Sequence, residues 1–255
     1  MILKALYNYY FRCREIYGDQ IPPLGFERRT MEYVILISKE GVFKKVITDQ
    51  DSFVPRATPN KTSGVEPNIL WDSAKYMLNY DDSGEIPNKY NDHCKSIVDI
   101  VCELSSNYPD NNGFRALNLF YSKKEYKNKK LLNDPLYPRI IQSKAISFKV
   151  LGEIGLVCSY SEELQSYILK RNDNNPKERC LITGNKASIV MTTGGFSLGM
   201  ANNGKVVSFQ KDSGYDSQGK QQCANAPMST EAEFAYTQAL KMLSESERNS
   251  VIQFR

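Results

Sequence analysis

The sequence has little of what metal-dependent chemistry requires. It contains one histidine, His93, and six cysteines, none of which forms a C-x-x-C pair. A zinc hydrolase or deaminase needs several His or Cys ligands at fixed spacing, so this class of enzyme is excluded. A Cys–His nucleophile made of His93 and Cys94 is disfavoured, because adjacent residues of a helix do not face each other. Carboxylates alone can bind magnesium, so nuclease activity is disfavoured without being excluded.

Long hydrophobic runs and an export signal are also missing. The longest apolar run, residues 33–37, has the length of a strand, whereas a membrane helix needs about 20 residues. Residues 1–17 are interrupted by charged side chains and lack a small-residue cleavage site, so they do not resemble a signal peptide. We therefore expect a cytoplasmic protein with reduced cysteines and no membrane contact.

The remaining composition is ordinary for a globular protein. Hydrophobic residues make up 41% and charged residues 24% of the 255 residues, which suits one large domain or two small ones. The net charge of +4 does not by itself indicate nucleic-acid binding. The positive charge is concentrated between residues 120 and 150, at Lys123, Lys124, Lys127, Lys129, Lys130, Arg139, Lys144 and Lys149. Such a cluster can bind phosphates, but a solvated loop tip is an equally good interpretation.

Hydrophobic periodicity predicts an α+β fold, in which antiparallel β-hairpins or small sheets pack with helices and long loops. Helices are expected at residues 1–17, 71–78, 90–104, 112–121 and 161–170, and from Thr230 onward. The first helix should bury a face made of Ile2, Leu6, Tyr9, Tyr10, Cys13 and Tyr17. Thr230 and Glu233 form a T-x-x-E pattern that predicts a capping box. Strand pairs are expected at 31–37 with 42–47, 145–150 with 155–159, and 180–183 with 187–190, and a single strand at 205–209.

Three polar regions are candidates for binding. Residues 48–68 are predicted to be a long loop, which is uncommon inside a compact domain unless the loop has a function. Residues 193–199 are rich in glycine but match neither the Walker nor the dinucleotide pattern, so they form either a loop that approaches a phosphate or an ordinary surface loop. Residues 205–225 carry lysines and amides that suit phosphate and sugar contacts, with a plain polar loop as the equal alternative.

Several blocks of the sequence, in order along the chain, resemble one family. They are the opening Met1-Ile2-Leu3-Lys4-Ala5-Leu6, then Pro23-Leu24-Gly25-Phe26, Ser63-Gly64-Val65-Glu66-Pro67-Asn68-Ile69-Leu70-Trp71-Asp72, Cys180-Leu181-Ile182-Thr183-Gly184, Val206-Val207-Ser208-Phe209, Gly219-Lys220-Gln221-Gln222, Asn225-Ala226-Pro227 and Glu233-Phe234-Ala235-Tyr236. Together they resemble the large subunit of the type I-C CRISPR Cascade surveillance complex. Gln210, Gln218 and Gln221 depart from the family pattern, so base contacts at these positions are left open. Family members are about twice as long, so we expect residues 1–255 to be the N-terminal α+β region, without a C-terminal helical region.

The resemblance implies a subunit without a catalytic centre or cofactor. It would recognise the protospacer-adjacent motif in target double-stranded DNA and hold the end of the complex that carries the 5′ handle of the guide crRNA. Its other partners would be the Cascade backbone and handle-binding subunits and a recruited helicase-nuclease, in a prokaryotic cytoplasm. The alternative is a mainly structural adaptor that docks on the Cascade backbone, with DNA handled by the missing C-terminal half.

Two sets of residues are predicted to contact nucleic acid. The predicted DNA-binding residues are Lys61, Thr62, Ser63 and Asn68, with Trp71 as a core anchor that holds the base of their loop. The predicted nucleic-acid backbone-binding residues are Gly194, Gly195, Lys205, Lys211, Lys220, Gln222 and Asn225. No catalytic and no metal-binding residue is predicted.

Overall fold

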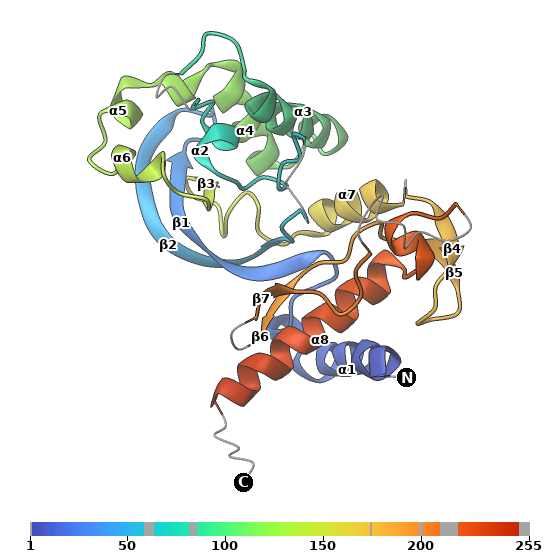
Figure 1. The fold of residues 1–255 in the computed structure, drawn as a ribbon. Coiled ribbons are helices and arrows are strands. Elements are labelled where there is room, and N and C mark those ends of the chain that lie inside the picture. Colours follow the sequence, from blue (N-terminus) through green and yellow to red (C-terminus); the bar gives the residue numbers. More distant parts are fainter. Residues whose placement is uncertain are drawn as a thin grey trace. The chain divides into compact units, whose positions relative to one another are not determined.

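The computed structural model describes residues 2–58, 64–81, 86–173, 175–198, 201–209 and 219–249. It confirms the α+β class, with a three-stranded mixed sheet, short antiparallel strand pairs and packed helices (Figure 1). The chain divides into two compact units. Unit 1 consists of Met1–Gly25 and Ile168–Arg255, and unit 2 is the continuous stretch Phe26–Tyr167. In the part of the chain that the structure describes, no helix is long and apolar enough to cross a membrane.

Unit 2 is built on the sheet β2-β1-β3. Strands β1 (Phe26–Ile37) and β2 (Phe43–Pro55) form the predicted hairpin, and they continue as a long curved ribbon (Figure 1). The turn between them fits tightly against helix α4 (Asn112–Ser122). A Cβ atom at Gly41, where φ is +75°, would lie 2.5 Å from the backbone nitrogen of Phe120, so only glycine fits this turn.

The structure corrects the predicted loop at residues 48–68. Residues 48–55 belong to β2, where Thr48 pairs with Tyr33 and Pro55 pairs with Phe26. The segment is polar because β2 is an edge strand, and Thr48, Asp49 and Asp51 are exposed. Its backbone pairs with β1 along residues 48–55, so a run that is polar in composition is still a strand. The loop therefore begins after Pro55.

The predicted hairpin at residues 145–159 is also wrong. Strand β3 (Ile146–Val150) is present, but it pairs in parallel with β1, from Tyr33↔Ile146 to Ile37↔Val150. Residues 155–159 form turns, because the Ser159 hydroxyl accepts a hydrogen bond from the Leu156 nitrogen at 2.7 Å and closes the segment on itself. Strand β3 pairs with the free edge of β1, which is 12 residues long, instead of with the short segment 155–159.

Helices gather on one side of the sheet in unit 2 (Figure 1). They are α2 (Ala74–Met77), α3 (Asp92–Asn107), α4, the 3-10 turn η2 (Glu125–Lys127), α5 (Lys129–Leu132) and α6 (Tyr137–Ile140). Asn91 caps α3 and Asn111 caps α4. The side-chain oxygen of each accepts a hydrogen bond from the backbone nitrogen three residues later, that of Cys94 and of Phe114 respectively. The rings of Phe120 and Phe148 lie 4.9 Å apart and join α4 to β3.

Unit 1 is built from segments near both ends of the described chain. Helix α1 (Ile2–Tyr17) packs against α8 (Thr230–Asn249), where Tyr10 meets Phe234 at 5.7 Å between ring centres. The other elements are η1 (Gly18–Gln20), α7 (Glu162–Asn172), which begins in unit 2, β4 (Lys177–Arg179), β5 (Lys186–Ser188), β6 (Phe196–Leu198), β7 (Ala201–Gly204) and η3 (Gln222–Asn225). Strands β4 and β5 pair with each other, as do β6 and β7.

Several predictions for unit 1 need correction. On α1, Leu6, Tyr10 and Cys13 are buried, whereas the remaining members of the predicted face, Ile2, Tyr9 and Tyr17, are exposed. The apolar residues of α1 form two adjacent stripes, and only one of them packs against α8. The predicted strand at 205–209 is absent from these residues, because the strand that pairs with β6 ends at Gly204.

The hairpin near Cys180 is shifted along the chain. The strands are β4 and β5, and residues 181–183 form the turn between them, because the Gly184 nitrogen donates to the Cys180 carbonyl at 2.8 Å. The start of α8 also differs from the prediction. The Ser229 hydroxyl accepts a hydrogen bond from the Ala232 nitrogen at 3.1 Å, so Ser229 and not Thr230 caps the helix.

Candidate nucleic-acid interface

The loop after β2 starts from a firmly held base in unit 2. Trp71 is 2% exposed, and its Nε1 donates a hydrogen bond to the Pro55 carbonyl at 2.7 Å. The Arg29 guanidinium lies over the indole ring at 4.6 Å and forms an ion pair with Glu27 at 3.1 Å. Trp71 therefore ties the end of β2 to the segment before α2, and its prediction as a core anchor is confirmed.

A chain of hydrogen bonds closes the loop above this anchor. The Thr58 nitrogen donates to Asn68 Oδ1 at 2.9 Å, and the Thr58 hydroxyl donates to the Pro67 carbonyl at 2.9 Å. The Asn68 nitrogen donates in turn to Asp72 Oδ2 at 2.9 Å. Asp72 is bridged to Ile146 at the start of β3 by two backbone hydrogen bonds of 2.9 and 3.1 Å. The two ends of the loop are thus fixed to each other and to the sheet.

Of the four predicted DNA-binding residues, the structure describes only Asn68. Lys61, Thr62 and Ser63 lie outside the described residues. Asn68 is 5% exposed, and its Oδ1 is already used by Thr58. A contact of Asn68 with a base would have to use its Nδ2 or give up that hydrogen bond. The burial of Asn68 was not visible in the sequence, because its partner Thr58 lies across the loop.

The glycine-rich segment in unit 1 is held by a buried carboxylate. The Gly194 nitrogen donates to Glu233 Oε1 at 2.8 Å, and Glu233, on α8, is 3% exposed. The same oxygen accepts from the Thr237 hydroxyl at 3.1 Å. The Thr193 hydroxyl donates to the Val207 carbonyl at 2.5 Å. The Gly194 nitrogen is therefore occupied within the protein, by Oε1 of Glu233.

The other predicted backbone-binding residues lie around η3 in unit 1. Lys220 is exposed, whereas Gly195, Lys205, Gln222 and Asn225 are partly buried. Asn225 Nδ2 donates to the Gln222 carbonyl at 3.0 Å and to the Lys220 carbonyl at 3.4 Å, so this side chain shapes the turn that presents Lys220. Gln222 has φ at +48°, a conformation that non-glycine residues rarely adopt. Lys211 lies outside the described residues.

Cys180 connects the β4–β5 turn to the start of α8. Its side chain is fully buried, and its Sγ accepts a hydrogen bond from the Ser229 nitrogen at 3.2 Å. Burial raises the pKa of this thiol, but hydrogen bonds from Ser229 and Thr183 outweigh burial and lower the pKa to about 7. The Cys180 thiolate is therefore stabilised as a hydrogen-bond acceptor within the fold.

The residues suspected of nucleophilic chemistry do not form a reactive pair. His93 packs edge-on against Tyr76, with 4.9 Å between ring centres. Cys94 is fully buried, and this burial raises the pKa of its thiol to about 12. Among the residues that the structure describes, no group of three or more His, Cys, Asp and Glu side chains could hold a metal ion.

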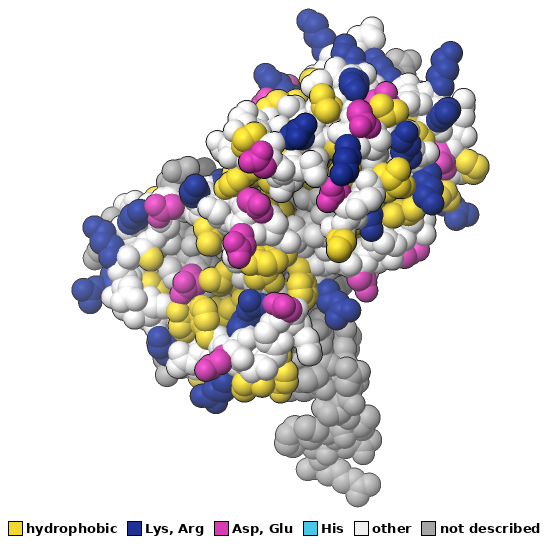
Figure 2. All heavy atoms as spheres, turned by 180° about the vertical axis from the view of Figure 1, so that it is seen from behind, with side chains coloured by type: hydrophobic (Ala, Val, Ile, Leu, Met, Phe, Trp, Pro, Cys, Tyr) yellow, Lys and Arg dark blue, Asp and Glu magenta, His cyan; other side chains and the backbone are white. Residues whose placement is uncertain are grey.

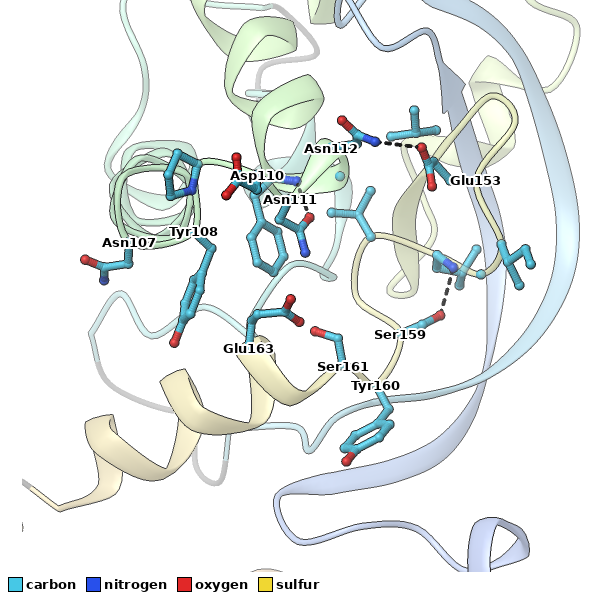
Figure 3. A pocket seen from close by; sticks show the side chains of 18 residues that line it. Asn107, Tyr108, Asp110, Asn111, Asn112, Glu153, Ser159, Tyr160, Ser161 and Glu163 are labelled. Carbon is cyan, nitrogen blue, oxygen red and sulfur yellow. Dashed lines mark hydrogen bonds between the residues drawn. The ribbon is translucent and has the colours of Figure 1, made fainter.

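A cavity of about 550 Å³ in unit 2 was not predicted from the sequence (Figure 3). It lies where the α3–α4 turn, the turns after β3 and the first turn of α7 meet, and its labelled acidic residues are Asp110, Glu153 and Glu163. Asn112 Nδ2 donates to Glu153 Oε1 at 3.0 Å. Three carboxylates make this cavity unfavourable for phosphate. No local pattern could reveal it, because its walls come from separate segments.

Comparison with known families assigns the chain to a class and then to a particular subunit. A protein-family model described as CRISPR-associated protein (Cas_Csd1) matches residues 6–254. The chain therefore belongs to this family of CRISPR-associated proteins. It is the large subunit of the type I-C Cascade complex, and subunits of this family are generally non-catalytic. No match was found among the curated proteins.

Proposed function

We propose that this chain recognises the protospacer-adjacent motif in target duplex DNA and holds the end of the complex that carries the guide RNA 5′ handle. It needs no cofactor for this role. Sequence beyond the motif is read by pairing between guide RNA and DNA, as in other RNA-guided effectors. The subunit contacts the Cascade backbone and handle-binding subunits, and its DNA-bound state recruits the helicase-nuclease that cuts.

The observation that carries this proposal is the fixed base of the loop in unit 2. Residues 59–63 connect Thr58 to Gly64, and Thr58 is bonded to both Pro67 and Asn68. A loop whose ends are fixed loses less conformational entropy when its tip binds a ligand. Lys61 supplies a cation for phosphate, and Thr62 and Ser63 supply hydroxyls for the groove edge. Asn68 supports the loop from below, and its own contact with a motif base stays a prediction.

Unit 1 supports a second contact that is blind to sequence. Lys220 is exposed on the turn that Asn225 shapes, and Gly195 and Lys205 precede it in the chain. Together with Lys211 and Gln222, these residues bind the backbone of the RNA handle or of the adjoining DNA strand. Gly194 takes part by positioning this segment, since its nitrogen is bonded to Glu233.

The test uses the assembled complex and two duplexes, one with the motif and one with the motif scrambled. Lys61→Ala combined with Thr62→Ala should cost about 1–3 kcal/mol of affinity for the correct motif and much less for the scrambled one. Lys95→Ala removes an exposed lysine of α3 in the same unit and serves as the control. An equal loss on both duplexes would show that the loop does not read the motif.

A structural adaptor is the second candidate, and helix α1 favours it. Ile2 and Ile16 are 72% and 63% exposed, and Tyr9 between them is 37% exposed. Residues seven apart lie on one side of a helix, so these three form an apolar stripe suited to a protein partner. If the adaptor role is the main one, Ile2→Ser with Ile16→Ser should reduce incorporation into the complex, and the separate chain should show no salt-dependent binding of motif-bearing duplex.

A further inference from the structure

Five lysines of unit 2 form one exposed basic surface. They are Lys44 on β2, Lys123 and Lys124 after α4, and Lys129 and Lys130 on α5. All five are exposed. Lys and Arg side chains gather along the margin of the molecule where Figure 1 places α5 and α6, which is the upper right in Figure 2. Only the structure joins Lys44 to the lysines that follow residue 120.

Glu125 connects the two segments that carry these lysines. Its Oε2 accepts hydrogen bonds from the Phe43 nitrogen at 3.2 Å and from Asn128 Nδ2 at 2.6 Å. Tyr126 and Leu131 are fully buried and anchor η2 and α5 below the surface. The start of β2 and the segment 123–130 are therefore held together from the inside, and their lysines are left outside.

Among the described residues, the positive charge of this surface is only partly offset, by the Glu40 carboxylate near Lys44 and Lys123. Lys44, Lys124, Lys129 and Lys130 make no ion pair with any described residue, and the Lys123 ammonium donates to a carbonyl, that of Glu40, at 2.7 Å. The pKa of Glu40 is lowered, first by the Ser38 hydroxyl and further by the charges of Lys44 and Lys123. Clustered like charges create a local potential that attracts an anionic partner.

The surface suits a duplex better than a single strand. The aromatic residues around it, Phe43, Phe120, Tyr121 and Tyr126, are all buried. Binding of single strands uses aromatic rings on which bases stack, and the four buried rings offer no such platform at this surface. A duplex offers phosphates on the outside and keeps its bases stacked within, so ammonium groups are sufficient to bind it.

We propose that this basic surface binds the phosphate backbone of duplex DNA without reading its sequence. The inference rests on the proposed function in one respect, which is that duplex DNA is the partner. The basic surface belongs to the same unit as the candidate motif-reading loop. It keeps the duplex bound while successive positions are sampled for the motif.

The test is a salt titration of the full chain with a 30-base-pair duplex that lacks the motif. The variant Lys44→Gln/Lys129→Gln/Lys130→Gln is compared with Lys95→Gln/Lys170→Gln/Lys186→Gln, which removes three exposed lysines elsewhere. The first variant should lower the slope of log affinity against log salt by about 2–3, and the control by less than about 1. A third variant, Lys44→Arg/Lys129→Arg/Lys130→Arg, should keep the wild-type slope and exclude a folding defect as the cause.

Several results would overturn the inference. They are no binding of the duplex by the wild-type chain, equal slopes for the two glutamine variants, or a slope loss for the arginine variant. Equal loss of binding to single-stranded DNA or to phosphatidylserine vesicles would assign the surface to another partner. Because the duplex carries no motif, failure here leaves motif discrimination by residues 61–62 intact, and failure of that discrimination leaves this slope unchanged.

Discussion

Unit 2 and unit 1 are stabilised in different ways. Unit 2 is one continuous stretch of chain, and its core follows β1, where Val34, Ile35 and Ile37 are fully buried. Unit 1 is completed only when α1 and α8, from opposite ends of the described chain, pack together. The comparison teaches that the candidate for motif reading lies in the unit with local connectivity. The proposed backbone contact around Lys220 lies in the unit assembled from distant segments, whereas the basic surface shares unit 2 with the motif-reading loop.

The largest effects should come from removing one core ring in each unit. Phe120→Ala in unit 2 and Phe234→Ala in unit 1 should each lower the free energy of unfolding by about 3–5 kcal/mol, because both side chains are buried. Hydrogen exchange followed by mass spectrometry should show the loss of protection mainly in the unit that carries the change. Equal loss in both units after either change would mean that they unfold as one body.

A smaller effect is expected at the buried carboxylate of unit 1. Glu233→Ala leaves the Gly194 nitrogen without its acceptor and should lower the free energy of unfolding by about 1–3 kcal/mol. Glu233→Gln keeps an oxygen that can accept from Gly194 and should cost less. Denaturant titration of both variants measures the difference. If glutamine costs as much as alanine, the hydrogen bond to Gly194 is not what Glu233 contributes.

Cys180 should give unit 1 a pH dependence that unit 2 lacks. Its folded pKa of about 7 is below the ordinary value of 9, so its stabilising effect is complete above pH 9 and is lost as the pH falls through 7. The difference in free energy of unfolding between the wild type and Cys180→Ala should therefore grow by about 2 kcal/mol from pH 6 to pH 9. A difference that is constant over this range contradicts a stabilised thiolate. Cys94→Ala in unit 2 is the control, because the raised pKa of Cys94 predicts the opposite trend toward high pH.

Strongly periodic helices could be predicted from the sequence, whereas pairing between distant segments could not. The stripes of α3 and α4 and the break at Gly41 are local, so their helices and the first hairpin were found. The partner of β3 was missed, because its parallel pairing with β1 depends on segments more than 100 residues apart. The length of β2 was missed because an exposed edge strand has the composition of a loop.

At the candidate sites too, local features could be predicted from the sequence and contacts between separate segments could not. Trp71 could be assigned to the core because a large ring at the start of an amphipathic segment is normally buried. The hydrogen bonds from Thr58 to Asn68 and from Gly194 to Glu233 could not be predicted from the sequence, because the two partners of each bond are not adjacent in the chain. The cap of α8 was placed one residue late, because Ser229 and Thr230 are both good caps and only the backbone decides between them.

The most direct test of the central claim compares the two units within the assembled complex. Affinities of Thr62→Ala and Lys220→Ala complexes are measured for motif-bearing and scrambled duplexes across a range of salt concentrations. The account predicts that Thr62→Ala lowers the preference for the motif by about 1–3 kcal/mol with little change in salt slope. It predicts that Lys220→Ala lowers the slope by less than about one unit and leaves both the preference and the melting temperature unchanged. Loss of motif preference with Lys220→Ala, and none with Thr62→Ala, would contradict the account.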